Sequence, residues 1–120
     1  MAWSFKQNGA IYLQIVFIVK SRIYSGIYKP GEYLPTVREL AQELSVNPNT
    51  VQKAFAELEE SGLICTYRTV GRAVTDDIEM IRRSKEATCK AEVASFMEEM
   101  RTMGMSKEDI ISALDGTQNN

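Results

Sequence analysis

The sequence contains no histidine and only two cysteines, and these scarcities exclude several kinds of chemistry. Without histidine the chain has no imidazole to serve as a metal ligand, a general base or a pH switch. Cys65 and Cys89 do not have the spacing of a metal or redox motif. There is also no phosphate-binding glycine loop and no recognisable pair of catalytic carboxylates. The sequence therefore argues against an enzyme, and we expect no metal and no cofactor.

Long hydrophobic runs are also missing. The longest apolar run, Ile15 to Val19, is far too short to span a membrane, and the start MAWSFKQNG lacks the charged n-region and apolar core of a signal peptide. With 44% hydrophobic and 25% charged residues, the 120-residue chain has the composition of an ordinary globular protein. We expect a cytoplasmic protein with reduced thiols and no membrane partner.

A strong positive charge is absent too, since the net charge is −2. Its distribution is uneven. Residues 1–75 carry eight Lys/Arg and six Asp/Glu, a net charge of +2, whereas residues 76–120 carry six and ten, a net charge of −4. Only the first part has an electrostatic attraction for phosphate. The length fits one domain and an appendage, so we expect a domain over 1–75 and a separate region over 76–120.

Two helix starts separated by a tight turn lie within residues 34–63. Thr36 and Glu39 have the spacing of a capping box, in which each side chain bonds a backbone N–H near the other residue. Asn47 and Pro48 suit the N-cap and the first position of a second helix. Apolar residues recur at helical spacing after each start: Val37, Leu40, Ala41 and Leu44, then Val51, Ala54, Phe55 and Leu58. This pattern predicts a helix-turn-helix, whose second helix can read the DNA major groove.

A further helix is expected before this segment. Residues 11–24 have helical periodicity, and Gly26 would end the helix. Phe17 and Ile18 widen its apolar surface beyond one stripe. They are either additional core contacts or part of an interface with a partner subunit. Residues 1–9 are expected to be a loosely held lead-in, in which Trp3 and Phe5 could pack on a neighbour.

A β-hairpin is expected after the helix-turn-helix. Residues 63–67 and 73–75 are β-prone, and the segment between them contains a glycine. A hairpin directly after a helix-turn-helix makes a winged helix, with the loop 68–72 as its wing. The fold class is therefore mainly α with a small β-hairpin.

Two helices are expected in residues 76–120. Asp76 and Asp77 can cap a long helix over 78–103, and a short helix follows Ser106 before a frayed tail from Thr117. On the long helix Cys89, Val93, Phe96, Met100 and Met103 recur at alternating steps of four and three, as in a coiled-coil seam.

Two such helices cannot enclose a core alone, and a second copy of the chain is the simplest partner. The residues expected to dimerise are Val93, Phe96, Met97, Met100, Met103, Ile110, Ile111 and Leu114. Packing is favoured over a ligand pocket for the methionines, and Cys89 is interpreted as a small core residue.

Residues 11–75 resemble the winged-helix domain of GntR-family bacterial transcription regulators. The resemblance rests on many positions at fixed spacing: Ile11-Tyr12 and Gln14-Ile15, Gly26, Pro30-Gly31, Leu34-Pro35, Arg38, Leu40-Ala41, Val46, Asn49-Thr50-Val51, Ala54, Leu58 and Gly62-Leu63-Ile64. The short C-terminal region is similar to that of the YtrA-like subfamily. This resemblance implies a dimeric repressor of its own operon that binds double-stranded operator DNA. Repressors of this subfamily often control operons that encode ABC transporters. A small-molecule effector, which the sequence does not identify, would act by changing the dimer geometry.

The resemblance also implies which residues touch DNA. Arg38 matches an arginine that binds a phosphate or a base edge, and Thr50 matches a threonine that contacts the backbone. The remaining candidates are polar residues of the second helix and the wing: Asn47, Asn49, Gln52, Lys53, Arg68, Gly71 and Arg72. Pro48 and Gln52 stand where relatives often have arginine, and Thr69 stands where the wing usually has its first glycine. Amides suit adenine rather than guanine, so we expect an operator that depends less on guanine or a looser complex.

Simpler interpretations stand beside these. Arg38 could form a surface ion pair with Glu39 or Glu43, and Asn47 could serve only as a helix cap. Asn49, Thr50, Gln52 and Lys53 could form a solvated helix face, as the glutamates within residues 57–60 are expected to do. As an alternative function, the winged helix could be a protein–protein interaction module that has lost DNA binding.

Overall fold

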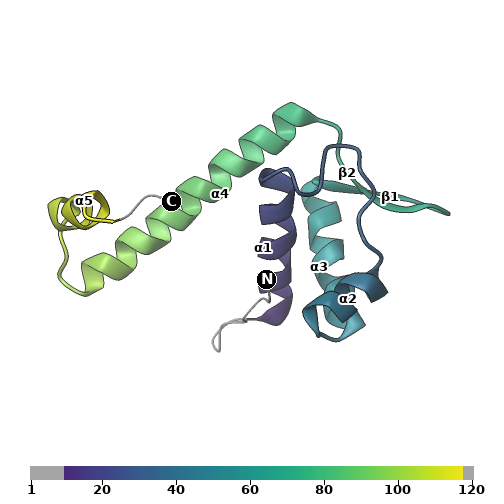
Figure 1. Cartoon of the computed structure of the whole chain (residues 1–120), viewed down its shortest axis with the longest axis horizontal. Helices are drawn as coiled ribbons and strands as arrows, with labels where there is room; N and C mark the ends of the chain where they lie inside the picture. Colours follow the sequence, from purple (N-terminus) through teal and green to yellow (C-terminus); the bar gives the residue numbers. More distant parts are fainter. Residues whose placement is uncertain (1–9, 118–120) are drawn as a thin grey trace. The chain divides into compact units, whose positions relative to one another are not determined.

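The structure, a computed structural model, describes residues 10–117 (Figure 1). The interpretation of Trp3 and Phe5 lies outside the described residues, as does the tail beyond Thr117. The elements follow in the order α1 (Ile11–Tyr24), α2 (Val37–Leu44), α3 (Pro48–Ser61), β1 (Ile64–Tyr67), β2 (Gly71–Val74), α4 (Ile78–Thr102) and α5 (Lys107–Asp115). The predicted class, mainly helical with a small antiparallel hairpin, is confirmed. The chain divides after Arg82 into two compact units.

Helices α1, α2 and α3 enclose the core of the first unit. Helix α3 runs beside α1 and also packs against α2 (Figure 1). Both predicted apolar stripes are buried, except that Val37 is half-buried at the core's edge. Phe55 and Leu40 are fully buried, and burying a side chain of this size contributes about 1.5–3 kcal/mol. The core thus fixes α3 from its inner face and leaves its outer face to solvent.

The two predicted helix starts are present. The Thr36 hydroxyl accepts a hydrogen bond from the Glu39 N–H at 3.1 Å, and the Glu39 carboxylate accepts one from the Thr36 N–H at 2.8 Å. The turn between α2 and α3 passes through Ser45, whose φ of +56° lies in the left-handed region. Asn47 caps α3 and Pro48 occupies its first turn.

The wing, defined here as β1, β2 and the turn of residues 68–70, begins directly after α3. Strand β1 pairs with β2 in antiparallel register, with Thr66 opposite Arg72 and Tyr67 opposite Gly71. The predicted loop, residues 68–72, is therefore two residues too long, because β2 begins at Gly71. A tight turn, closed by the Val70 N–H on the Tyr67 carbonyl at 3.1 Å, leaves Gly71 and Arg72 within the strand.

The wing is also tied to the segment that leads into α2. Tyr33 forms an isolated β-bridge with Ala73, and the Leu34 N–H donates to the Arg72 carbonyl at 2.8 Å. The Val74 N–H donates to the Glu32 carbonyl at 2.9 Å. Because these bonds join β2 to the segment before α2, the wing is held against the approach to α2 as well as against α3.

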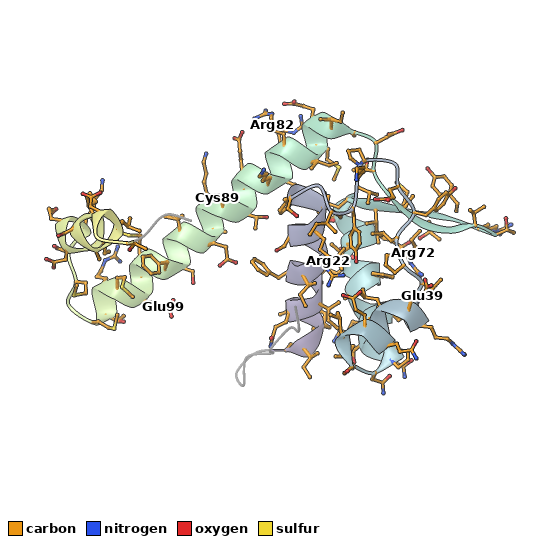
Figure 2. All side chains as sticks on the ribbon, in the orientation of Figure 1. Arg22, Glu39, Arg72, Arg82, Cys89 and Glu99 are labelled. Atoms are coloured by element: carbon orange, nitrogen blue, oxygen red, sulfur yellow. The ribbon has the colours of Figure 1, made fainter. Side chains whose placement is uncertain are left out.

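On α1, the structure separates the two residues that widened the apolar surface. Ile18 is buried, as expected for a core contact, whereas Phe17 is 41% exposed. Near the end of the helix, Arg22 donates to the Tyr28 hydroxyl at 2.6 Å and to the Glu43 carboxylate of α2 (Figure 2). The Glu43 bonds are the main reason why the pKa of Arg22 is raised, although partial burial opposes them. This network joins α1 to α2.

Helix α4 begins in the first unit, where the Asp77 side chain accepts a hydrogen bond from the Met80 N–H at 3.0 Å. Met80 and Ile81 pack against the core of that unit, so the contacts group the start of α4 with the winged helix and not with the predicted C-terminal region. Within residues 10–117, no helix combines the length and the hydrophobicity needed to cross a membrane.

The second unit contains the rest of α4 and α5. Ser106 and Asp109 form a capping box that starts α5, and the bonds from Ser106 lower the pKa of Asp109. In the described part of this unit Ile110 is the one buried side chain. The interpretation of Cys89 as a core residue is wrong for the single chain, because its side chain is exposed. Two helices of this size do not cover one another's apolar faces.

Candidate nucleic-acid interface

The first turns of α3 present polar side chains to solvent. Asn47, Asn49, Gln52 and Lys53 are exposed, and Thr50 is half-buried. The buried stripe of α3 lies on the opposite face, so these side chains occupy one open end of the helix. Backbone N–H groups at a helix N-terminus also favour an approaching anion. The predicted polar face is therefore available to a large ligand.

Asn47 has one of its two polar atoms engaged. Its Oδ1 accepts a hydrogen bond from the Asn49 N–H at 2.8 Å and so caps the helix. A bidentate contact to adenine needs both the side-chain oxygen and the NH₂ group. While the cap is in place, the NH₂ group of Asn47 is the part of the amide that the cap does not use, and as a donor it suits an acceptor such as guanine O6 or thymine O4.

Arg38 is exposed on α2 and forms no ion pair with any residue that the structure describes. The two acidic candidates for such a pair are engaged elsewhere. Glu39 closes the capping box, and Glu43 binds Arg22 (Figure 2). The simpler interpretation of Arg38 as half of a surface ion pair is therefore wrong, and its charge is available to an external anion.

Two open grooves bring α2, the start of α3 and the wing together. One has a volume of about 620 Å³ and is lined by α2 and the turn before α3, including Gln42 and Val46. The other, of about 450 Å³, lies between Arg38 and Pro48 on one side and Val70, Gly71 and Arg72 of the wing on the other. Thr36, Arg38 and Pro48 line both grooves. Arg38 therefore stands where the helix-turn-helix meets the wing.

Lys53 is exposed, and its ammonium lies against a ring of α1. Its ammonium lies 4.1 Å from the centre of the Tyr12 ring, the geometry of a cation–π contact. This contact joins α3, the helix expected to read DNA and called the recognition helix below, to the first turn of α1. Sequence reasoning placed Lys53 beside the DNA contacts but gave no partner for it.

The two wing arginines are in different environments. Arg68 is exposed in the turn and has no ion-pair partner within residues 10–117. Arg72 points back to α3, where its Nε donates to the Glu59 carboxylate at 3.1 Å (Figure 2). Glu59 is half-buried, so its assignment to a solvated face is wrong. No sequence motif joined Glu59 to the site.

An aromatic pair beside the wing was also missed. The rings of Tyr33 and Tyr67 meet edge to face, with their centres 6.2 Å apart, and each residue is about half exposed. The pairing depends on the β-bridge that brings Tyr33 to the hairpin. Because the bridge forms between distant segments, no local pattern indicates it.

Three features define a winged-helix DNA-binding transcription regulator. They are a helix-turn-helix whose second helix has a polar, exposed start, an arginine on its first helix with no ion-pair partner among the described residues, and a β-hairpin wing. The model of the family described as "Bacterial regulatory proteins, gntR family" matches residues 11–78. The chain belongs to this GntR family, as the sequence predicted, and it is a regulator and not an enzyme.

Two relatives come from Bacillus subtilis strain 168. The uncharacterized HTH-type transcriptional regulator YhcF is 31% identical over 110 residues, which are 92% of this chain and 91% of YhcF. The HTH-type transcriptional repressor YtrA is 48% identical over 72 residues, which are 60% of this chain and 55% of YtrA. The first of these similarities extends through both units of the chain.

Solved structures show the same fold. A GntR family transcriptional regulator from Listeria monocytogenes has a TM-score of 0.86 and 38% identity, covering 95% of this chain and all of the other. The DNA-binding domain of AraR in complex with operator ORX1 has a TM-score of 0.55 and 25% identity, covering 62% of this chain and 95% of the other. Family membership favours DNA binding over the alternative of a protein–protein interaction module.

Proposed function

We propose that this protein is a repressor that binds a near-palindromic operator as a homodimer and regulates its own operon. The observation that carries the proposal is the junction around Arg38. Its guanidinium, which has no ion-pair partner in the part of the chain that the structure describes, adjoins the polar start of α3 and a groove bordered by the wing. The repressor role is supported by the likeness to YtrA, which is itself named a repressor. Binding to an operator is supported by the AraR domain, which has this fold and was solved on its operator.

The proposed contacts divide into two groups. Arg38, Thr50 and Arg68 bind phosphates, with Gly71 allowing the wing backbone to approach the DNA. Asn47, Asn49, Gln52 and Lys53 face base edges or the adjacent backbone. Phosphate contacts supply most of the affinity and make it salt-sensitive, whereas base contacts supply the sequence preference.

Dimerisation is assigned to the second unit. Val93, Phe96, Met103, Ile111 and Leu114 are each at least 43% exposed in the single chain. Next to them, an apolar groove of about 220 Å³ is lined by Phe96, Met100, Met105, Ile110, Ala113, Leu114 and Thr117. Met97 and Met100 are half-buried beside these residues. A second copy would cover this surface, and the two recognition helices would then enter successive major grooves.

The likeness to YtrA also suggests where the protein acts and which genes it controls. A repressor of its own operon acts in the cytoplasm, on the nucleoid. For regulators similar to YtrA, the controlled genes often include those of an ABC transporter, so we propose such an operon here. Repression of a reporter placed behind the chain's own upstream region would support this assignment, and unchanged reporter expression would refute it.

The central experiment is selection of duplexes from a random-sequence library with the full-length protein. We expect an enriched, near-palindromic motif whose half-sites are about one helical turn apart, or a multiple of that. Binding should weaken steeply as salt rises. If no duplex binds even at about 50 mM salt, where non-specific association is strong, the proposed function is wrong.

Replacing Arg38 tests the junction directly. Arg38→Ala should weaken binding to the selected duplex about tenfold or more, and it should leave the far-UV circular dichroism unchanged because the side chain is exposed. Arg101→Ala, which removes another exposed arginine, on α4, is the matched control and should bind as the wild type does. Wild-type affinity in Arg38→Ala would remove this contact from the proposal.

A further inference from the structure

One carboxylate holds both strands of the wing on the recognition helix. Glu59 lies near the end of α3, and its Oε2 accepts a hydrogen bond from the Thr66 hydroxyl of β1. Its Oε1 accepts one from Arg72 Nε of β2 at 3.1 Å. Thr66 and Arg72 are directly opposite in the register. A single side chain of α3 therefore fixes the hairpin at one rung of its ladder.

The Arg72 side chain is also held by the core. Its guanidinium carbon lies 5.2 Å from the centre of the Phe55 ring, and Phe55 is fully buried. Phe55 precedes Glu59 by one helical turn, so Arg72 contacts two successive positions on the same face of α3. The Arg72 side chain is only 21% exposed. This packing leaves the guanidinium little freedom to turn toward a ligand.

The charge of Arg72 is compensated within the protein. The bond from Thr66 is the main reason why the pKa of Glu59 is lowered, and the bond and charge of Arg72 add to it, while burial opposes both. Arg68, by contrast, is exposed at the turn and unpaired within the described part of the chain. Only a cation that reaches the phosphates releases counterions from DNA. Of the two wing arginines, Arg68 is therefore the one whose charge is available to a DNA phosphate.

We propose that Arg72 is a positioning residue for DNA binding: with Glu59 and Thr66 it sets the wing on the recognition helix, while Arg68 supplies the wing's phosphate contact. The proposal rests on the DNA-binding function proposed above. It changes the role that the family resemblance implied for Arg72, because a charge held by Glu59 orients the hairpin and does not neutralise DNA.

The salt dependence of binding separates the two roles. The full-length protein is titrated with the selected duplex and with a scrambled duplex of the same length over a range of salt concentrations. The slope of log affinity against log salt is negative, and Arg68→Ala should reduce its magnitude by about 0.9, the value for one lost phosphate contact, on both duplexes. Arg72→Ala should weaken binding to the selected duplex about tenfold with the slope unchanged. If Arg72→Ala reduced the magnitude of the slope as much as Arg68→Ala does, the positioning role would be overturned.

Two milder variants distinguish the roles without deleting the arginine. Thr66→Val removes the hydroxyl that donates to Glu59, and it alters no charge and suits a strand. It should therefore weaken DNA binding, as Arg72→Ala does, without changing the salt slope. Glu59→Gln should also weaken binding. In the Arg72→Ala background it should weaken binding by less than it does alone, since its contact with Arg72 is already absent and only the bond from Thr66 remains to be altered. If Arg72 instead reached a phosphate, Glu59→Gln would free it and tighten binding, which would overturn the proposal.

Hydrogen exchange in the free protein provides a readout that does not depend on DNA. Arg72→Ala, Glu59→Gln and Thr66→Val should each speed exchange at the hairpin amides and spare those of α1, whereas Arg68→Ala should affect neither. Slow hairpin exchange in all three variants would overturn the proposal even if they bind DNA weakly. Failure of the wild type to bind any duplex would instead refute the proposed function, which makes the two failures distinguishable.

Discussion

A single side chain in this protein often has two possible roles, and the local hydrogen bonds decide between them. Asn47 could cap α3 or read a base, and its oxygen is committed to the cap. Arg38 could pair with a neighbouring carboxylate or remain free. It has no ion-pair partner among residues 10–117, because Glu39 and Glu43 already have partners. The bonds of the flanking residues therefore determine which atoms remain for DNA.

Asn47 can be tested by separating its cap from its amide donor. Asn47→Ala should destabilise the protein by about 1 kcal/mol, because the N–H that Asn47 caps loses its acceptor. Asn47→Ser should retain most of the stability, since a hydroxyl also caps, but it has no NH₂ group for a base. We expect Asn47→Ser to lose about tenfold in affinity for the selected duplex. Urea unfolding and DNA titration measure the two effects.

Two results would contradict this division of roles for Asn47. If Asn47→Ser were as unstable as Asn47→Ala, the cap would not be the source of the stabilisation. If Asn47→Ser bound the selected duplex as tightly as the wild type, the amide would make no base contact.

Glu59 makes the stability of the winged helix depend on pH. Because its pKa is lower in the folded protein than the ordinary value of 4.5, the unfolded chain binds the proton more readily. The stability that this carboxylate adds is thus fully present above pH 4.5 and is lost as the pH falls below it. We expect Glu59→Gln to be less stable than the wild type at neutral pH, with the difference shrinking as the pH drops below about 4.5.

Thermal unfolding of the two proteins at a series of pH values checks this expectation. Glu60→Gln, which removes a carboxylate from the exposed neighbouring position, is the matched control and should not show the same convergence. A constant difference between Glu59→Gln and the wild type across the range would mean that the ionised carboxylate adds nothing.

At the residue scale, the sequence reveals a contact only when its partners are close in the chain. The capping box of Thr36 and Glu39 was predictable because its spacing is fixed by helix geometry. The bond between Glu59 and Arg72 was not, since it depends on where α3 ends and on the register of the hairpin. The prediction for Lys53 was also incomplete, because its partner Tyr12 lies on another helix.

At the scale of elements, local patterns identified every helix of the described chain and left small errors at the wing. Apolar periodicity and caps gave α1, α2 and α3 nearly to the residue. The wing was expected to have a longer loop, because β-propensity alone did not include Gly71 and Arg72 in a strand. The cross-strand partners, and the bridge from Tyr33, supply those bonds. Sheet boundaries are thus decided by pairing between segments.

The ends of α1 and α3 offer a comparison between two glycines with left-handed backbones. Gly26 has φ +85° and an added Cβ there would meet nothing within 4 Å. Gly62 has φ +88°, and a Cβ there would lie 2.8 Å from Met80 Cε at the start of α4. Gly26→Ala should cost about 1 kcal/mol from the backbone alone. Gly62→Ala should cost more, because Met80 must also move.

Denaturant unfolding of the two alanine variants measures the difference. Since the methionine tip is flexible, the additional cost of Gly62→Ala should be on the order of 1 kcal/mol or less. Truncating the methionine in a Gly62→Ala/Met80→Ala double variant should remove this additional cost when compared with Met80→Ala alone. Equal costs for Gly26→Ala and Gly62→Ala would show that Met80 does not restrain the end of α3.

At the scale of the whole molecule, the two units differ in how completely they bury their apolar residues. The first unit encloses its core between three helices and the hairpin. The second exposes Val93, Phe96, Met103 and Leu114, although each lies in an apolar pattern that the sequence predicts to be a packing surface. We therefore propose that a partner supplies the packing that this unit lacks.

Replacing Phe96 tests whether a second copy is that partner. Phe96 is 43% exposed in the single chain and lines the apolar groove between α4 and α5. A carboxylate buried at the proposed seam would lose its hydration without gaining a partner, so Phe96→Asp should sediment as a monomer where the wild type sediments as a dimer. Ser95→Asp places the same charge one residue away, off the predicted seam, and should remain a dimer.

The Phe96→Asp monomer should keep the fold of the winged helix, because Phe96 lies outside that unit. It should still bind a single half-site, and it should lose the gain in affinity that two linked recognition helices have on a palindrome. A Phe96→Asp protein that stayed dimeric, or that bound the palindrome as tightly as the wild type, would show that the seam does not join the subunits.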